Sequence, residues 1–175
     1  ERQWSLVGSE MCIRDSSNRA YQANDLDAQC FVSIHHNGST DTTAQYTVCL
    51  YDSLPETDGA FPGLSRDTDS TLALKIGYRI ENLFGLTLSK SHPMNVNHSF
   101  TVMSRSTMAS TISEASFITE YNEATIFYNE LQMSNPNDRM CINDEALAIY
   151  EGYRSWCDGQ GIGTVRYNYL RWLHE

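Results

Sequence analysis

The sequence predicts an α/β domain of three layers, in which a twisted, mostly parallel sheet is flanked by helices. The 175-residue chain has the length of a single domain, and 41% of its residues are hydrophobic, so it can bury a core without disulfide bonds. Short runs of β-branched and aromatic residues alternate with segments of helical periodicity, which is typical of layered α/β folds. We find no internal repeat and no domain boundary along the chain.

Charge and hydropathy exclude two kinds of partner. The 12 basic residues face 22 acidic ones, which gives a net charge of −10 at pH 7. Nucleic-acid binders need clustered Lys and Arg to displace counterions from phosphates, so we expect no nucleic-acid partner. No apolar run approaches the roughly 20 residues that cross a bilayer, so we expect no membrane span.

The cysteines predict neither a zinc cluster nor a disulfide framework. Their number is odd and no two form a Cys-x-x-Cys pair. We expect them to be small buried hydrophobic residues or incidental thiols. They are Cys12, Cys30, Cys49, Cys141 and Cys157.

The first 16 residues look foreign to the fold. They have neither helical nor strand periodicity. Read back as codons, residues 6–15 correspond to CTC GTG GGC TCG GAG ATG TGT ATA AGA GAC, and such a DNA sequence resembles the transposase adaptor used to build sequencing libraries. We therefore predict a non-native adaptor-like segment over 1–16 and a domain over 17–175 that is incomplete at its N-terminus.

The first elements of the domain are a helix end and two strands. We expect a short helix end over 18–27 and a buried strand over 30–34, which the pair Asn37-Gly38 closes as a turn. Residues 44–51 are rich in aromatic and β-branched residues and predict a second strand. The segment 55–66 contains two prolines and two glycines and predicts a surface loop.

A long helix and two further strands follow. The apolar residues of 70–84 recur at helical spacing, and Gly85 lies where a helix would end. Residues 100–103 and 111–118 predict two strands around a polar connection. The apolar positions that predict the helix are Leu72, Ile76, Ile80 and Leu83.

Two helices complete the domain. We expect one over 123–133 and another over 143–157, with Asn143 as the N-cap of the second. Its predicted core face consists of Ala146, Ile149, Tyr153 and Trp156.

Two places carry groups suited to catalysis. His35 and His36 follow the predicted strand 30–34, and neutral imidazoles at strand ends are common zinc ligands. Adjacent strand residues point to opposite faces, so the two histidines cannot both line one face. An exposed, purely polar strand end is the alternative.

The second place is Glu114, a carboxylate that interrupts a strand-like segment. A carboxylate in a buried strand must be paired, bound to a metal or functional. The alternative is a glutamate on the solvated face of an edge strand. Sequence spacing by itself does not show that Glu114 and the histidines meet.

Taken together, these segments resemble the zinc-dependent N-acetylmuramoyl-L-alanine amidases of the type-3 group. Arg19 with Ala23-Asn24, followed by Phe-Val-Ser-Ile-His-His-Asn over 31–37, resembles the family block Arg-x-x-x-Ala-Asn…Phe-Val-Ser-Ile-His-x-Asn. The stretch Glu-Ala-Ser-Phe-Ile-Thr-Glu over 114–120 stands where the family has Glu-x-Gly-Phe-Leu-Ser-Asn. The resemblance covers roughly residues 18–159.

The resemblance implies a mechanism and a place of action. It assigns His35 as a ligand of one zinc ion and Glu114 as the group that moves the proton of the attacking water, while His36 falls at a variable position. The substrate would be peptidoglycan, cleaved between the lactyl group of N-acetylmuramic acid and L-alanine. Such cell-wall hydrolases, whether autolysins or phage endolysins, act outside the cell or in the cell wall.

The chain departs from the family pattern at several positions. The family's early zinc-binding His and Glu would precede Arg19, where this chain carries only the adaptor-like segment, so we expect the first strand to be lacking. One imidazole makes a poor zinc site, and we predict weak zinc binding and little hydrolysis. The histidines at 92, 98 and 174 have no partner at ligand-like spacing.

A non-catalytic module and another class of hydrolase are the alternative functions. A peptidoglycan-binding module that kept the fold and lost catalysis is the alternative from another class. A serine or cysteine hydrolase is disfavoured, because the sequence contains neither a Gly-x-Ser-x-Gly elbow nor a cysteine in a recognisable nucleophile motif.

Overall fold

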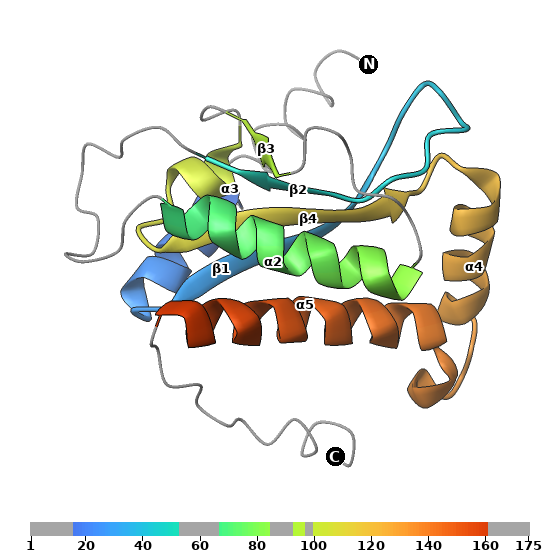
Figure 1. Ribbon diagram of the computed structural model, residues 1–175. Helices are drawn as coiled ribbons and strands as arrows, with labels where there is room; N and C mark the ends of the chain where they lie inside the picture. The colour runs from blue at the N-terminus through green and yellow to red at the C-terminus, as the bar shows by residue number, and fades with distance from the viewer. Residues whose placement is uncertain (1–15, 53–66, 85–92, 97–99, 161–175) are drawn as a thin grey trace.

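The structure is a computed structural model that describes residues 16–52, 67–84, 93–96 and 100–160 (Figure 1). Most of the adaptor-like segment, the loop predicted over 55–66 and the histidines at 92, 98 and 174 lie outside these residues. The described chain begins with a helix over residues 16–25, which agrees with the predicted helix end.

A four-stranded sheet forms the centre of the domain, in the order β1-β4-β2-β3. β1 and β4 are parallel, as are β2 and β3, whereas β2 and β4 are antiparallel. The predicted α/β fold with a mostly parallel sheet is therefore confirmed. β1 is an edge strand of the sheet in the described part of the chain. The strands are β1 (Cys30–Asn37), β2 (Val48–Tyr51), β3 (Met94–Asn95) and β4 (Ala109–Phe117).

The two faces of the sheet carry two separate cores. α2 (Asp67–Phe84) and α5 (Met140–Gln160) lie side by side along one face (Figure 1). The larger cluster joins these helices to the sheet, with Ile76, Ile80 and Trp156 fully buried. The smaller cluster, on the opposite face, joins β2 and β4 to α3 (Thr101–Ser104). Helices thus flank the sheet as predicted.

The α2–α5 contact is unusually close at one glycine. A Cβ atom on Gly152 of α5 would lie 2.6 Å from Cα of Ile76 in α2. Real Cβ atoms do not approach backbone so closely, so this position requires a residue without a side chain. In the rest of the α5 core face, Ala148 and Ile149 are buried, whereas Ala146, which we expected there, is exposed.

The strand predicted over 100–103 is wrong. These residues belong to the single helical turn α3, whose Val102 and Met103 are buried in the smaller cluster. A short apolar run does not distinguish a strand from one turn of helix, since both bury adjacent apolar side chains. Here the backbone forms helical hydrogen bonds: the N–H groups of Ser104 and Arg105 donate to the carbonyls of Phe100 and Thr101, respectively.

The predicted N-cap of the last helix is also wrong. α5 begins at Met140, three residues before Asn143. The carboxylate of Glu130, at the end of α4 (Tyr121–Leu131), accepts the backbone N–H groups of Cys141 and Ile142 at 2.7 and 3.0 Å. A group from the preceding helix therefore satisfies the first turn, and sequence signals near Asn143 could not reveal it.

The remaining elements agree with the sequence in type and differ at their ends. β2 is shorter than the segment 44–51, and β1 continues past Ile34 to Asn37. A 3₁₀ turn, η1 (Pro136–Asp138), separates α4 from α5. Cys49 and Cys157 are buried thiols, and Cys30 and Cys141 are partly buried. Among the described helices, none combines the length and apolar character needed to cross a membrane.

Candidate active site

The parallel pairing of β1 with β4 places His35 directly opposite Glu114. In the neighbouring antiparallel pair of β4 with β2, Glu114 is the register partner of Val48. Register partners share a face of the sheet, and Val48 belongs to the smaller core cluster. His35 and Glu114 therefore both project to the α3 side of the sheet, from neighbouring strands.

Glu114 has the environment of a tuned acid–base group. Its side chain is about half buried, and its Oε2 atom is buried with no hydrogen-bond partner among the described residues. Burial raises the pKa of Glu114 to about 7, because the charged form loses hydration. A carboxyl group with this pKa can both accept and release a proton near neutral pH.

His35 is exposed at the end of the edge strand. Its Nε2 atom lies 2.8 Å from the hydroxyl of Ser33, two residues back on the same face. This contact orients the ring, and the tautomer decides which group donates. The imidazole is accessible to a ligand from solvent.

The described residues do not by themselves fit a zinc ion. A catalytic zinc site uses three protein ligands and one open position. Within the described ranges, no group of three His, Cys, Asp or Glu side chains is arranged to hold a metal. His35 and Glu114 supply one imidazole and one carboxylate, and the orphaned Oε2 of Glu114 is the only feature of this pair that calls for a further partner.

His36 points to the opposite face, as strand alternation predicts. Its Nδ1 lies 3.1 Å from the hydroxyl of Ser116, and its Nε2 lies 3.4 Å from a carboxylate oxygen of Glu145 in α5. The ring also packs on Phe127 of α4, with centroids 4.3 Å apart. Burial, and secondarily the charge of His35, lower the pKa of His36.

A bulge in β4 makes the His36 contacts possible. Asn37 pairs with Phe117, so two steps along β1 correspond to three along β4. The extra residue turns Ser116 toward His36 instead of toward the face of Glu114. Sequence analysis did not identify Ser116 and Glu145 as partners of His36, because a bulge has no clear sequence signal and α5 is distant in sequence.

The Asn24 position of the Arg-x-x-x-Ala-Asn block has a structural role. Its side chain donates to the carbonyl of Arg105 at 2.9 Å and accepts from the N–H of Thr107 at 3.0 Å. These bonds tie the first described helix to the connection that leads into β4. They help to fix the position of the start of β4, and therefore the position of Glu114.

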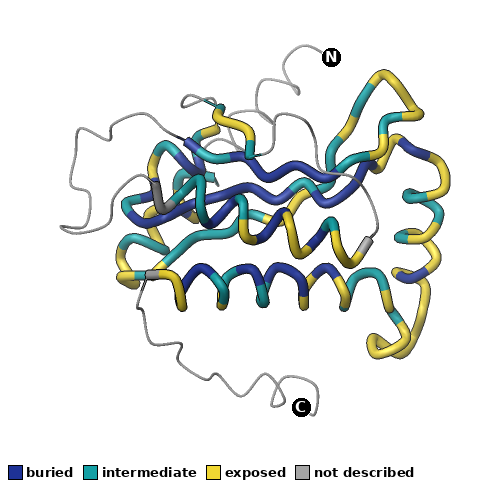
Figure 2. The backbone as a smooth tube through the Cα atoms, in the orientation of Figure 1, coloured by how far each residue is buried: buried dark blue, intermediate teal, exposed yellow. Residues whose placement is uncertain are grey.

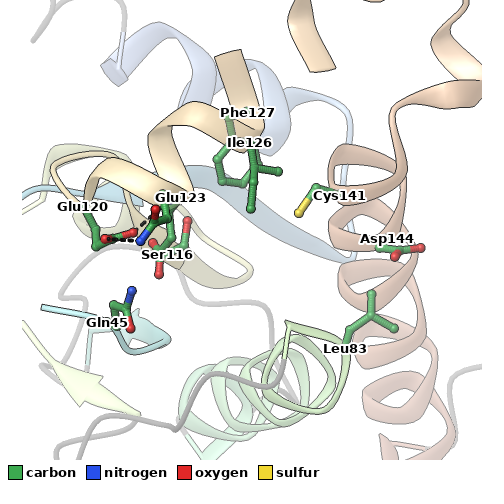
Figure 3. Close-up of a pocket in the computed structure, with 10 residues that line it drawn as sticks. Gln45, Leu83, Ser116, Glu120, Glu123, Ile126, Phe127, Cys141 and Asp144 are labelled. Carbon is green, nitrogen blue, oxygen red and sulfur yellow. Dashed lines mark hydrogen bonds between the residues drawn. The ribbon is translucent and has the colours of Figure 1, made fainter. Parts of the chain in front are cut away.

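A cavity of about 350 Å³ opens between the end of β4 and helices α2, α4 and α5 (Figure 3). We call it the α4–α5 pocket. Neither His35 nor Glu114 lines it, so it is separate from the pair described above. Its lining consists of Gln45, Leu83, Ser116, Glu120, Asn122, Glu123, Ile126, Phe127, Cys141 and Asp144.

Comparison with known proteins gives one family and a consistent set of folds. The family model described as N-acetylmuramoyl-L-alanine amidase matches residues 9–135, more than half of the chain. No curated protein sequence matches the chain at a significant level.

Three solved structures are similar to this one. The catalytic domain of CwlV, an N-acetylmuramoyl-L-alanine amidase from Bacillus (Paenibacillus) polymyxa var. colistinus, has a TM-score of 0.58 at 21% identity, over 82% of this chain and 65% of that one. The N-acetylmuramoyl-L-alanine amidase of Clostridium difficile 630 gives 0.61 at 23% identity, over 82% and 65%. The amidase Ami1 of Mycobacterium smegmatis gives 0.60 at 19% identity, over 82% and 60%. The chain thus spans less than two thirds of each of these chains, and at such identities the likeness concerns the fold.

Proposed function

Because this chain belongs to the N-acetylmuramoyl-L-alanine amidase family, we propose that it hydrolyses the amide bond between the lactyl group of N-acetylmuramic acid and L-alanine in peptidoglycan. The observation that carries the proposal is the β1–β4 register, which puts His35 and Glu114 on one face of neighbouring strands. The place of action is the bacterial cell wall, outside the cell, whether the protein acts as an autolysin or as a phage endolysin.

Glu114 performs the proton transfers of the proposed reaction. Its carboxylate accepts a proton from water as the water oxygen attacks the amide carbonyl carbon. It then gives that proton to the nitrogen of L-alanine as the C–N bond breaks, leaving a lactyl carboxylic acid on the glycan and a free amine on the peptide. A pKa of about 7 suits both steps, since neither protonation state is strongly favoured near neutral pH.

The zinc dependence of the reaction belongs to the proposal as well. His35 is the proposed ligand, and the other ligands are not supplied by the described residues. We therefore expect this chain to bind Zn²⁺ weakly and to hydrolyse peptidoglycan slowly.

The test compares peptidoglycan hydrolysis by the chain and by Glu114→Gln. Gln preserves the size of the side chain and removes its ability to accept a proton, so we expect the release of muropeptides to fall by about 10²- to 10⁴-fold. Peptidoglycan co-sedimentation should be unchanged. Glu151→Gln is the matched control, because Glu151 is a half-exposed glutamate of α5 that pairs with Arg79.

Metal content is measured on the same samples. We expect less than one zinc per chain after dialysis against micromolar Zn²⁺. Stoichiometric zinc with rapid hydrolysis would contradict the expected weakness of the chain. Retained binding with no turnover in the unaltered chain, even with excess Zn²⁺, would identify the non-catalytic peptidoglycan-binding module instead.

A further inference from the structure

The bulge in β4 follows directly after Glu114. Ala115 belongs to the larger core cluster and the hydroxyl of Ser116 points to the same side, so two consecutive residues face α2 and α5. Phe117 returns to the α3 side, where its ring packs on Tyr46, which contacts the smaller cluster, with centroids 4.6 Å apart. The alternation of β4 therefore changes once, at the bulge.

This change of alternation puts Glu114 and Phe117 on the same face. Residues three apart in a regular strand point to opposite faces. Glu114 and Phe117 are three apart, yet both face the α3 side, where His35 also lies. Without the extra residue, a Phe117 that kept its contact with Tyr46 would turn Glu114 toward α2 and α5, away from His35. The bulge thus decides whether Glu114 and His35 share a face.

Thr47, which directly precedes β2, bonds to the first residue of the bulge. Its Oγ1 atom donates to the backbone carbonyl of Ala115 at 2.8 Å. Both residues are fully buried. A buried carbonyl that loses a donor has no water to replace it, so this bond is a strong constraint on the backbone next to Glu114.

Glu123, in the first turn of α4, bonds to the last residue of the bulge. Its Oε2 atom accepts the backbone N–H of Phe117, and its carboxylate lies beside the hydroxyl of Ser116 (Figure 3). Glu120, the N-cap of α4, accepts the N–H of Glu123 at 2.8 Å and so fixes the start of this side chain.

The bond from Glu123 to β4 differs from an ordinary capping box. In a capping box, a glutamate three residues after the N-cap accepts the N–H of the N-cap residue. Here the N–H of Glu120 donates to the carbonyl of Phe117 at 3.1 Å instead. Glu123 reaches three residues further back, to the N–H of Phe117, so the start of α4 is bonded to the end of β4.

We propose that Thr47 and Glu123 are positioning residues that hold the β4 bulge and thereby keep the side chain of Glu114 on the face of His35. The inference rests on the role in proton transfer proposed above for Glu114. Both residues act through the backbone of β4, one on each side of Ser116. They come from different elements, so each holds the bulge independently of the other.

The experiment compares, for each residue, a variant that removes its bond with one that keeps it. Thr47→Val preserves the size of the side chain and removes the donor, whereas Thr47→Ser keeps a hydroxyl. Glu123→Ala removes the acceptor, whereas Glu123→Gln keeps an oxygen that can accept the N–H of Phe117.

Thr111→Val is the matched control. Thr111 is a fully buried threonine of β4, three residues before Glu114, and its Oγ1 donates to the carbonyl of Leu50 in β2 at 2.8 Å. Its substitution removes the same kind of buried bond between a threonine and a carbonyl, outside the bulge.

NMR measures the position of Glu114 in each folded variant. One readout is the NOE between the side-chain protons of Glu114 and His35, which are register partners. The other is the exchange rate of the amide of Ile118, which donates to the carbonyl of Asn37 at 3.0 Å just past the bulge. This rate is divided by that of Ile112, which lies before the bulge, so that global unfolding does not enter the ratio.

Loss of either bond should change both NMR readouts. We expect Thr47→Val and Glu123→Ala to weaken the NOE about twofold or more and to raise the exchange ratio about tenfold or more, because local opening at the bulge becomes easier. Thr47→Ser, Glu123→Gln and Thr111→Val should keep both readouts near those of the unaltered chain.

Peptidoglycan hydrolysis distinguishes positioning from a purely structural role. In Thr47→Val we expect kcat for muropeptide release to fall about tenfold or more while KM changes by less than about twofold, because the proton-transfer group is displaced and the substrate contacts are not. Thr47→Ser should restore kcat to within about threefold, and Thr111→Val should leave it within the same range.

Unchanged NMR readouts in both Thr47→Val and Glu123→Ala would overturn the proposal, as would an equal change in Thr111→Val. If Thr47→Val does not fold, the two Glu123 variants decide the outcome. Absence of hydrolysis by the unaltered chain would contradict the proposed function instead, and the NMR readouts would still decide whether these two side chains hold Glu114 in place.

Discussion

His35 and His36 are neighbours in sequence and occupy opposite environments. His35 lies on the exposed side of the edge strand, with Ser33 as its hydrogen-bond partner, and faces the same side as Glu114. His36 is packed among Ser116, Phe127 and Glu145, which come from three other elements. The two sides differ in what packs on them: residues of α4 and α5 contact His36, whereas His35 is exposed among the residues that the structure describes.

The end of β1 thus carries one histidine that packs against other elements and one that is exposed. β4 is buried along almost its whole length, whereas β1 is only partly covered (Figure 2). On the His36 side the imidazole contacts Ser116 and Glu145 and so joins β1, β4 and α5, although Oε1 of Glu145 has no hydrogen-bond partner among the described residues. On the His35 side Oε2 of Glu114 is likewise unsatisfied, and it lies on the same face as the exposed imidazole of His35.

α5, which contacts His36 through Glu145, packs closely on α2. Breaking the α2–α5 contact should therefore have the largest effect on stability. In Gly152→Ala the new methyl group would meet the backbone of Ile76, and the two helices must move apart. We expect a loss of about 3 kcal/mol in the free energy of unfolding, at the upper end for overpacking because the clash is with backbone, measured by urea denaturation.

Gly159→Ala is the matched control for this change. Gly159 is an exposed residue of the same helix, and nothing lies within 4 Å of the Cβ that alanine would add. We expect this substitution to raise stability by about 0.5–1 kcal/mol through helix propensity. Similar losses in both variants would show that the close approach at Gly152 is not the cause.

The buried carboxylate of Glu145 should make the His36 side sensitive to pH. Burial raises the pKa of Glu145 from 4.5 to about 7, so its contribution to stability is complete below pH 4.5 and is lost as the pH rises through 7. A shift of this size corresponds to about 3 kcal/mol. Among titratable groups, His36 contacts the carboxylate of Glu145, and the charge of Glu145 acts on the thiols of Cys141 and Cys49.

Glu145→Gln removes the titration. We expect the fall in unfolding free energy between pH 5 and pH 8 to be about 2–3 kcal/mol smaller in this variant than in the unaltered chain, since Gln does not ionise. Denaturant unfolding at each pH measures it, with Glu151→Gln as the control. An equally steep fall in Glu145→Gln would show that the pH dependence arises elsewhere.

Replacing each histidine by alanine tests the comparison directly. His36→Ala removes the contacts with Ser116 and Phe127 and leaves Glu145 without its partner, so we expect a loss of about 2 kcal/mol. His35→Ala removes one exposed contact and should change stability by less than about 0.5 kcal/mol. Thermal and urea unfolding of the two variants decide the matter, and comparable losses would refute the unequal covering.

The smallest effect concerns the open edge. Ile34 is 57% exposed on β1, whose outer edge is unpaired in the described part of the sheet. Such edges favour pairing with another chain, and a lysine there opposes it. We expect Ile34→Lys to reduce concentration-dependent self-association in sedimentation experiments and to change stability by less than about 0.5 kcal/mol, whereas Tyr128→Lys on α4 should leave association unaltered.

Periodic patterns over long segments predicted the fold well, and short or capped segments did not. Leu72, Ile76 and Ile80 recur at helical spacing and are all fully buried in α2. The run at 100–103 is too short to carry a period, so its burial could be satisfied by one helical turn. The start of α5 depends on Glu130, a residue of another helix, and lies beyond any local capping signal.

The sequence predicted two candidate residues of the site and missed the contacts around His36. His35 and Glu114 were identified from sequence, and their common face follows from the register of β1 and β4. Their roles in catalysis and zinc binding stay predictions. The partners of His36 and the α4–α5 pocket were not identified, because they assemble from β4, α4 and α5, which no local pattern connects.

The sequence by itself determined which residues alternate along the strands, which helical stripe is apolar and which side chains can move protons. These are properties of local geometry, where a period of two or 3.6 residues sorts side chains onto faces. The tertiary structure alone decided that β1 pairs with β4 in the register of His35 and Glu114, that a bulge turns Ser116 to His36, and that burial raises the pKa of Glu114. Register and burial depend on contacts between distant segments, and such contacts exist only once the layers have packed.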